Sequence, residues 1–522
     1  MSTSSAMVSR PAAAVSGVLA AGSALAAGHL VAAPLQPSAS PLLAVGNSVI
    51  DLAPQPVKEF AIRTFGTADK PVLLAGMGLV ILVLAVLAGL LSRRDPTPGS
   101  VLIAVFGLLG CVAALSRPDS AITGLLAPIA AGLVGVLVFR WLLARGRPDQ
   151  HTAPPLAESG GRTSVVRADR RRFLSSSAVV AVGAGLAAAG GTVLGRSADL
   201  SASRQRVADA LATAPPAPPV PAGADFAPAG TPTFITPNAE FYRIDTALIV
   251  PRLRAEDWRL RVHGMVEREL TLSFADLLSR PALTRTITLA CVSNPVGGDL
   301  ISTASFAGVP VRDLLAQAGV RPGAQQVIST SSDGFTAGTP VDVLLDPGRD
   351  ALLAYAMNGE PLPAEHGFPV RMVTPGLYGY VSATKWLVDL EVTTFDRPAY
   401  WVRRGWSQQA PVKTQSRIDR PRARAALPAG TVTVAGIAWA QHTGVDQVEV
   451  RVDDGPWQPA RLSTEVSADT WRMWRVDVEL AAGEHTVTCR ATDRSGRTQT
   501  EQPADPAPDG ATGWHSVSFT TG

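Results

Sequence analysis

The chain has 522 residues, enough for several domains, and its 46 basic and 43 acidic residues give a net charge of +3. This charge is small and scattered, and no basic stripe with interleaved aromatic residues suggests nucleic-acid binding. The three cysteines, Cys111, Cys291 and Cys489, imply no disulfide framework. A nucleic-acid-binding protein and a disulfide-stapled scaffold are therefore excluded, and Cys291 is left as a potentially reactive thiol.

Residues 1–195 are dominated by Ala, Leu, Val and Gly, which predicts a transmembrane region with about five helices. The apolar stretches are about 12–33, 72–91, 101–115, 122–143 and 176–194. The second and fourth are long enough to cross a bilayer as helices, the third needs its flanking residues, and the first is only weakly apolar. Between the first two, Pro41 to Gly66 mixes apolar and charged residues and predicts an interfacial helix.

Charge sets the expected orientation of these helices. Arginines follow the second and fourth stretches: Arg93, Arg94, Arg140, Arg145 and Arg147. The positive-inside rule places them in the cytoplasm, while the turn Arg117-Pro118-Asp119 faces outward. We therefore expect a multi-pass plasma-membrane protein whose residues after about 196 lie on the extracytoplasmic side.

The fifth stretch follows Asp169-Arg170-Arg171-Arg172-Phe173-Leu174, which looks like a twin-arginine export signal placed inside the chain. An ordinary basic anchor before a transmembrane helix explains the same residues nearly as well, although the weakly apolar, Ala- and Gly-rich helix that follows favours the signal. No convincing small-residue cleavage motif follows, so we expect the helix to remain as an anchor.

Haem ligation between membrane helices usually needs pairs of His or Met ligands. Only His29 of the seven histidines lies in an apolar stretch, where a helix-packing role is the better interpretation. The membrane region is therefore predicted to be an anchor, or a module that docks a quinone or a partner protein, and not a haem protein.

The rest of the chain divides into a linker and two domains. Residues 196–235 include the proline-rich run 214–221 and predict an extended Ala/Pro-rich linker. In 236–400, strand and helix patterns mix without regular alternation, which predicts an α+β domain. The expected strands are 258–264, 284–291 and 326–330, and the expected helices are 273–278, capped by Ser273, and 310–318. No Gly-rich turn of the dinucleotide-binding type is present.

Residues 427–522 consist of short alternating runs separated by turns such as Asp453-Asp454-Gly455 and Asp493-Arg494-Ser495-Gly496. Several short strands at this spacing predict a β-sandwich of immunoglobulin type. The two cysteines of an antibody domain are absent.

Four segments of the α+β region occur in an order that resembles the sulfite oxidase family of molybdenum enzymes. They are Thr236–Arg243, Thr286–Asn294, His366–Arg371 and, after Pro375-Gly376, Ser382–Trp386. The resemblance covers about 230 to 500. It implies a molybdopterin-binding oxidoreductase domain, followed by a dimerisation-type domain through which a homodimer could form.

The resemblance also implies a molybdenum-molybdopterin cofactor whose metal is bound by Cys291. A thiolate suits this soft metal, and one protein ligand is enough because the cofactor supplies most of the coordination. Taken alone, Cys291 would read as a small buried hydrophobe on a strand. The cofactor contacts that the resemblance implies are Asn238, Phe241, Tyr242, Asp333, His366, Arg371, Ser382, Thr384 and Lys385. For Asp333 a turn-forming role is an equally good interpretation, and for Arg371 and Lys385 a surface ion pair is the alternative.

The chain departs from the family in one important place. Soluble sulfite oxidases have two arginines after the Asn that follows the metal cysteine, whereas Asn294 is followed here by Pro295 and Val296. An anionic substrate such as sulfite would lose nearby positive charge. Tyr380, for which we predict a catalytic role, or Tyr378 could provide a hydroxyl near the metal.

We therefore expect a membrane-anchored molybdopterin-dependent oxidoreductase that transfers an oxygen atom on a small oxide substrate at the outer face of the plasma membrane. Twin-arginine export would let a domain loaded with cofactor in the cytoplasm cross in its folded state. Because no cytochrome domain precedes the catalytic part, a separate electron-transfer protein or a quinone is expected as partner. The alternative is a non-catalytic, membrane-anchored binding protein whose cofactor site has decayed.

Overall fold

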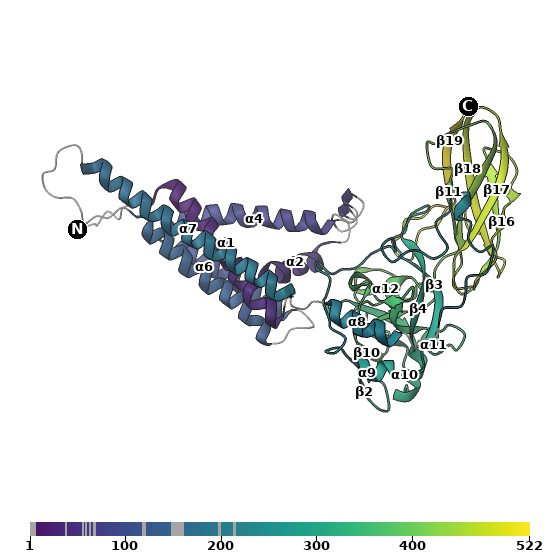
Figure 1. Cartoon of the computed structure of the whole chain (residues 1–522), viewed down its shortest axis with the longest axis horizontal. Helices are drawn as coiled ribbons and strands as arrows, with labels where there is room; N and C mark the ends of the chain where they lie inside the picture. The colour runs from purple at the N-terminus through teal and green to yellow at the C-terminus, as the bar shows by residue number, and fades with distance from the viewer. Residues whose placement is uncertain are drawn as a thin grey trace. The chain divides into compact units, whose positions relative to one another are not determined.

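The computed structural model describes residues 7–36, 39–54, 57, 60–61, 64–65, 69–116, 122–147, 161–196, 200–211 and 216–522. The chain divides into two compact units (Figure 1). The first is Met1–Asp199 with Ala247–Ile249, and the second is Leu200–Thr246 with Val250–Gly522. Each unit has its own packing and is described by itself.

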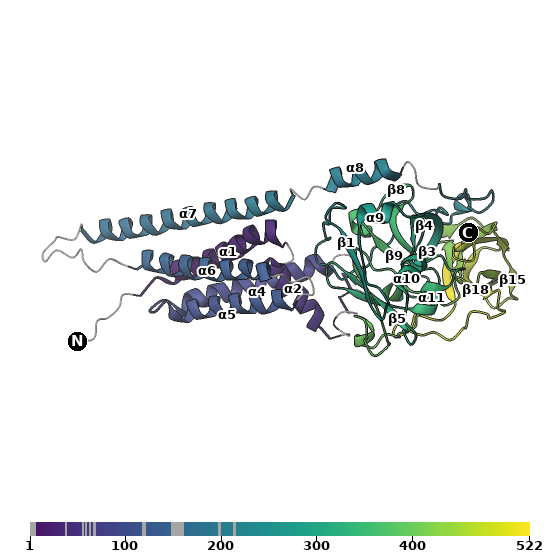
Figure 2. The ribbon, with the colours of Figure 1, turned by 90° about the horizontal axis from the view of Figure 1, so that it is seen from below.

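The first unit is helical. Its helices are α1 (Arg10–Leu35), α2 (Pro41–Leu52), α4 (Asp69–Leu91), α5 (Thr97–Leu115), η3 (Ile122–Leu125), α6 (Leu126–Arg145) and α7 (Gly161–Arg196). Figure 2 shows α1, α4, α5, α6 and α7 running alongside one another. Within the described ranges, five helices are long and apolar enough to cross a membrane: Arg10–Leu35, Lys70–Leu91, Thr97–Leu115, Ile122–Arg145 and Arg170–Leu194.

In the predicted interfacial segment, Pro41 to Gly66, the structure has the helix α2. Part of the segment after α2 lies outside the described residues, and so does the predicted turn Arg117-Pro118-Asp119.

Glycines bring α1 and α4 into close contact. A Cβ on Gly17 would lie 1.9 Å from the carbonyl oxygen of Ala85, and one on Gly89 would lie 2.0 Å from that of Ala13. Small residues at such a crossing allow the backbones of apolar helices to approach.

The prediction of an extended linker over 196–235 is wrong for much of its length. Helix α8 spans Leu200–Leu211 and buries Leu200, Ser203 and Val207, which share one face at helical spacing. Farther along, Phe234 is also buried in the domain. The proline-rich run, of which 214 and 215 lie outside the described residues, dominates the composition and hides this short amphipathic pattern.

Two sheets form the first part of the second unit, one mixed and one with only antiparallel pairs among the described strands. One has the order β2-β1-β10-β5-β6, made of β2 (Leu270–Ser273), β1 (Arg259–Gly264), β10 (Leu387–Thr393), β5 (Gln326–Ser331) and β6 (Thr336–Pro340). The other has the order β3-β4-β7-β8, made of β3 (Leu283–Ala290), β4 (Ile301–Pro310), β7 (Leu352–Met357) and β8 (Glu360–Pro361), with β9 (Arg371–Val373) beside β7.

Short helices accompany these sheets: α9 (Phe274–Leu278), α10 (Val311–Ala318), α11 (Val341–Leu345) and α12 (Gly379–Ser382). The predicted α+β class and the predicted strands and helices of this region are confirmed. Ser273 caps α9 through a capping box with Asp276, as its position suggested. A single apolar core lies under both sheets.

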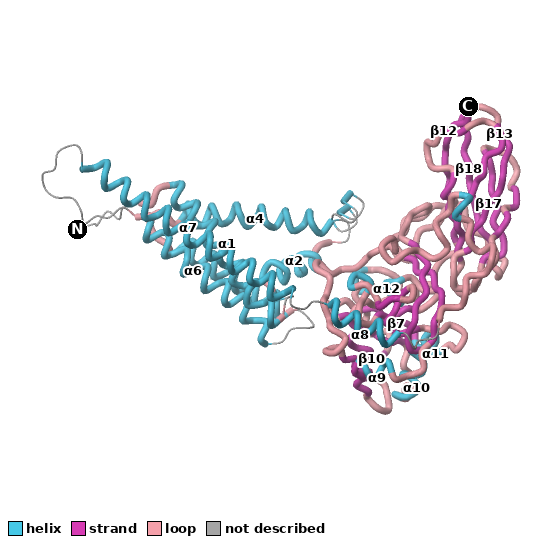
Figure 3. Tube along the Cα trace, in the orientation of Figure 1, coloured by secondary structure: helices cyan, strands magenta, loops and turns pink. Residues whose placement is uncertain are grey.

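The C-terminal part is a β-sandwich, visible as long paired strands in Figure 3. One sheet contains β11 (Gln415–Arg420), β13 (Gly430–Trp439), β17 (Arg472–Leu480) and β16 (Arg461–Leu462). The other contains β12 (Ala426–Leu427), β19 (His515–Thr521), β18 (Gly483–Asp493), β14 (Val445–Val452) and β15 (Gln458–Pro459). Val434, Trp474 and Phe519 are buried between them.

The sandwich begins before the predicted start at 427, because β11 pairs with β13. The charged side chains of Arg417, Asp419 and Arg420 hide the strand in the sequence, although Arg417 is buried. All three cysteines lie in the described part of the chain and are free thiols, as the sequence predicts.

Candidate active site

Cys291 lies directly after β3, an edge strand whose residues all pair with β4. Ala290 pairs with Ile301 of β4, the Cys291 N–H donates to the carbonyl of Leu300 at 2.9 Å, and the Cys291 carbonyl accepts from the N–H of Asn294 at 3.1 Å. The N–H and the hydroxyl of Ser293 hydrogen-bond to the sulfur. The thiol is thus presented from a fixed backbone.

Burial raises the pKa of the Cys291 thiol, although Ser293 and the positive charge of Lys385 act in the opposite direction. Cys291 is partly buried, and a thiol with a raised pKa is a poor nucleophile at neutral pH. A bound metal cation removes this cost, because a coordinating thiol is deprotonated. The environment of Cys291 therefore fits a metal ligand better than an attacking group.

Two buried cations and one buried histidine come from the segments around β9. The Lys385 ammonium lies 3.1 Å from Asp245 Oδ2 and donates to the carbonyl of Glu365 at 3.0 Å. Arg371 is 3% exposed and donates to the carbonyl of His366 at 3.2 Å. No carboxylate within the described residues pairs with Arg371, so positive charge at the site exceeds negative charge.

Burial governs the ionisation of all three groups. It lowers the pKa of Arg371 to about 10 and that of Lys385 to about 8, the latter against the attraction of Asp245. Burial, together with the charges of Arg371 and Lys385, lowers the pKa of His366 to about 3. At neutral pH His366 is therefore an uncharged hydrogen-bonding group beside two cations.

Two polar atoms of this cluster are buried without a hydrogen-bond partner in the described chain: Arg371 Nε and His366 Nδ1. The other ring nitrogen of His366 lies 3.1 Å from the carbonyl of Asn238, which can only accept, so Nε2 carries the proton and Nδ1 is an acceptor. Leaving such atoms unpaired costs about 1–3 kcal/mol each. A ligand that carries an anionic phosphate and ring N–H donors, as molybdopterin does, would satisfy both.

Aromatic side chains form one wall beside His366. The ring of Phe241 stands edge to face with His366 at 5.4 Å and stacks on Tyr242 at 5.5 Å. The Asn238 side chain is held by Asn358 and by the carbonyl of Met357. The upstream segment and the His366–Arg371 segment, far apart in sequence, are therefore brought together.

Three other predicted residues use their polar atoms within the protein. Ser382 Oγ lies within 3.1 Å of the carbonyls of Leu377 and Tyr378, and Thr384 Oγ1 lies 2.7 Å from Ser329 Oγ. Asp333 Oδ1 accepts from the Phe335 N–H in the turn between β5 and β6. Ser382 therefore supports the backbone around α12, Thr384 links the chain after α12 to β5, and Asp333 has the turn-forming contact that its sequence context suggested.

The hydroxyl of Tyr380, predicted to be catalytic, and those of Tyr242 and Tyr378 have different surroundings. The Tyr380 hydroxyl donates to the carbonyl of Ser407 at 2.6 Å. The charge of Cys291 acts instead on Tyr242 and Tyr378, and burial together with this charge raises the pKa of Tyr378 to about 12. A Cβ on Gly379 would lie 3.8 Å from both the Tyr242 hydroxyl and the carbonyl of Ala290, which places that hydroxyl beside the end of β3.

Sequence reasoning missed Asp245, the carboxylate that partly neutralises Lys385 from 140 residues away. An aspartate in a loop carries no local signal of such a partner. The sequence offers both Tyr378 and Tyr380 as hydroxyl donors near the metal, and their spacing of two residues gives no reason to prefer Tyr378.

Comparison with known proteins places the chain in a family. Residues 247–401 match the oxidoreductase molybdopterin binding domain, and residues 406–517 match the Mo-co oxidoreductase dimerisation domain. Sulfite oxidase of Gallus gallus is 35% identical over 321 residues, which are 52% of this chain and 69% of that protein. The chain belongs to the sulfite oxidase family. It is a molybdenum-dependent oxidoreductase of that family, and its cofactor is molybdenum-molybdopterin.

A second relative and a solved structure are also similar to this chain. Mitochondrial sulfite oxidase of Homo sapiens is 33% identical over 316 residues, which are 50% of this chain and 57% of that protein. The sulfane dehydrogenase SoxCD from Paracoccus pantotrophus is a solved structure with 25% identity and a TM-score of 0.48, covering 54% of this chain and 80% of its own. Both family matches lie after residue 246.

Proposed function

We propose that this protein catalyses oxygen-atom transfer between water and a small oxide substrate, with Cys291 as the protein ligand of the metal. The observation that carries the proposal is the pair of unpaired buried atoms, Arg371 Nε and His366 Nδ1, in a cationic cluster near a thiol at a strand end. When bound, the cofactor supplies the redox metal at which oxygen is transferred.

The residues of the chain bind and orient that cofactor. Arg371 and Lys385 would supply positive charge for its phosphate, His366 Nδ1 would accept a hydrogen bond from its ring system, and Phe241 and Tyr242 would form an apolar wall beside it. The buried hydroxyls of Tyr242 and Tyr378 remain protonated at neutral pH and can donate a hydrogen bond near the sulfur.

Molybdenum and pterin analysis of the purified chain tests this proposal, followed by assays with sulfite and with neutral oxides such as methionine sulfoxide. We expect both metal and pterin, with turnover of at least one substrate class. A folded chain with neither component, purified from a host that makes the cofactor, would instead favour a binding protein with a decayed site.

We also propose that the helical unit anchors the protein in the plasma membrane, with the catalytic part on the extracytoplasmic side. Five helices are long enough to cross a membrane. Arginines follow the second and the fourth of the apolar stretches, and the positive-inside rule places these ends in the cytoplasm. Protease treatment of spheroplasts tests it: the domains after residue 200 should be digested while a cytoplasmic marker protein stays intact, and protected domains would contradict the orientation. Substitution of Arg170 and Arg171 by lysine should block export if the twin-arginine signal is used.

The match to a dimerisation domain supports a homodimer through the C-terminal sandwich, and electrons would pass to a separate protein or a quinone. Light scattering of the purified chain in detergent tests the oligomeric state. A single-chain mass at micromolar concentration would contradict the dimer.

A further inference from the structure

The C-terminal sandwich holds the chain on the upstream side of Cys291. Three residues before the cysteine, the N–H of Thr288 donates to the carbonyl of Asp469 at 3.0 Å, and Thr288 Oγ1 accepts from the N–H of Trp471 at 2.7 Å. Trp471 is itself fixed, because it is 2% exposed and its indole N–H donates to the carbonyl of Phe234. The strand that carries Cys291 is therefore anchored to the loop before β17.

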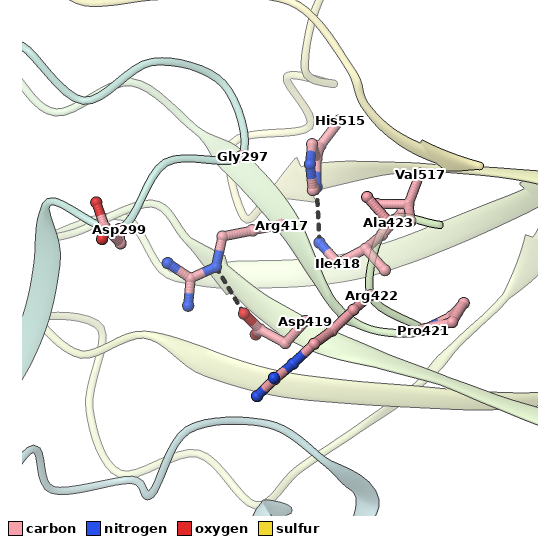
Figure 4. Close-up of a pocket in the computed structure, with 10 residues that line it drawn as sticks. All are labelled: Gly297, Asp299, Arg417, Ile418, Asp419, Pro421, Arg422, Ala423, His515 and Val517. Carbon is pink, nitrogen blue, oxygen red and sulfur yellow. Dashed lines mark hydrogen bonds and ion pairs between the residues drawn. The ribbon is translucent and has the colours of Figure 1, made fainter. Parts of the chain in front are cut away.

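The sandwich also holds the chain on the downstream side. Arg417 of β11 donates through Nη1 to the carbonyl of Gly298 at 2.8 Å. Its Nε donates to Asp419 Oδ1 at 2.8 Å, as Figure 4 shows. Arg417 is 8% exposed, so these bonds are shielded from water. Asp419 fixes the direction of the guanidinium, and the guanidinium fixes Gly298, seven residues after the cysteine.

His515 of β19 adds a packing contact to the same loop. Its Nδ1 accepts from the N–H of Ile418 at 3.0 Å, which sets the ring orientation. A Cβ on Gly297 would lie 2.3 Å from His515 Cδ2 and Nε2, so the loop backbone rests on the ring where only glycine fits. Gly297, Arg417 and His515 line a cavity of about 320 Å³ seen in Figure 4.

The loop between these two anchors makes few hydrogen bonds of its own. Besides the two backbone bonds of Cys291 with Leu300 and Asn294, the N–H of Gly298 donates to Pro295 and the N–H of Leu300 donates to Asn294 Oδ1. A metal ligand has to be held within about 0.5 Å of its productive position. The anchors from the sandwich supply the restraint that the loop lacks.

We propose that Arg417 and Thr288 are positioning residues, which hold the Cys291 thiol from both sides and make the sandwich part of the active-site architecture. This proposal rests on the assignment of Cys291 as the metal ligand. It assigns to the C-terminal domain a role beyond subunit association.

The first test uses the full chain produced without cofactor and measures the alkylation rate of Cys291 by peptide mass spectrometry. Arg417→Gln and Thr288→Val should each raise this rate roughly fivefold, because each removes side-chain hydrogen bonds that anchor the chain beside Cys291. Arg422→Ala is the matched control, since Arg422 lines the same cavity but makes no hydrogen bond to the loop among the described residues. Its alkylation rate should equal that of the parent chain.

The second test uses the loaded enzyme. Arg417→Gln and Thr288→Val should retain molybdenum and pterin but shift the Mo(V) electron paramagnetic resonance signal, which reports on the metal–sulfur geometry; a merely stabilising contact would leave it unchanged. Parental alkylation rates and a parental signal in both variants would overturn the proposal. If Arg417→Gln does not fold, Thr288→Val decides alone. Absence of molybdenum would contradict the proposed function and leave the alkylation result intact.

Discussion

The expected roles of the two units depend on individual residues to different degrees. In the catalytic unit, a few atoms contributed by distant segments define the site, and Lys385 and Asp245 pair across 140 residues. In the helical unit, length and apolarity carry the expected role, and individual positions such as Gly17 and Gly89 matter where helices cross closely. Single substitutions should therefore act strongly at the site and weakly on the exposed helix surfaces.

The largest effect is expected at the metal ligand. Cys291→Ser replaces a soft thiolate by a hydroxyl and should lower kcat/KM by on the order of 10³-fold or more, with little change in thermal stability. Cys111→Ser, a substitution in α5, is the control and should keep full activity. Steady-state kinetics and molybdenum content measure both, and an active Cys291→Ser enzyme with bound metal would contradict the assignment of the ligand.

Arg371→Met separates cofactor binding from folding. The substitution removes a buried cation without a carboxylate partner, so the cofactor-free chain should be equally stable or about 1–3 kcal/mol more stable. The same change should strongly reduce the pterin content. Denaturant unfolding and pterin analysis give the two values, and a cofactor-free variant that is markedly less stable than its parent would show that Arg371 has a structural role instead.

The close crossing of α1 and α4 offers a test of packing in the helical unit. Gly17→Leu introduces a Cβ that would lie only 1.9 Å from the carbonyl oxygen of Ala85, so it should destabilise the helical unit by about 1–3 kcal/mol. Leu82→Ala on the exposed face of α4 should have little effect. Thermal unfolding in detergent compares them, and equal melting temperatures would contradict the close packing of α1 and α4.

The smallest expected effect is a pH dependence from His366. Its pKa is about 3 in the folded chain against 6.5 for the free side chain, so the unfolded state binds more protons between these values and stability falls as pH decreases through this window. Between pH 6.5 and 5 the cofactor-free chain should lose about 1–2 kcal/mol from this group. Denaturant unfolding at several pH values gives the free energy of unfolding as a function of pH. In His366→Gln this free energy should fall less between pH 6.5 and 5, and an equal fall in the two proteins would place the ionisation elsewhere.

Local patterns were sufficient to predict much of the fold. Alternating residues indicated β1, β3 and β5, and Ser273 indicated the start of α9, because strand alternation and helix capping are read within a few residues. Helix α8 was missed because the proline-rich run after it dominated the composition. Strand β11 was missed because Arg417 is buried through ion pairing and not through apolarity.

The candidate site was predicted less completely than the fold. The order of the motifs predicted Cys291, His366, Arg371 and Lys385 as site residues. Asp245 and Arg417 could not be predicted, because their contacts join segments far apart in the sequence and produce no local pattern. Tyr378 could be separated from Tyr380 only once the hydroxyl of Tyr380 was seen to donate to Ser407.

Metal ligation by Cys291 is tested most directly by the molybdenum and pterin content of the purified full-length chain beside that of Cys291→Ser. We predict about one metal and one pterin per parent chain, with the metal lost or its spectrum changed in the variant. Equal metal content and identical spectra in the two proteins would show that the sulfur of Cys291 is not the ligand.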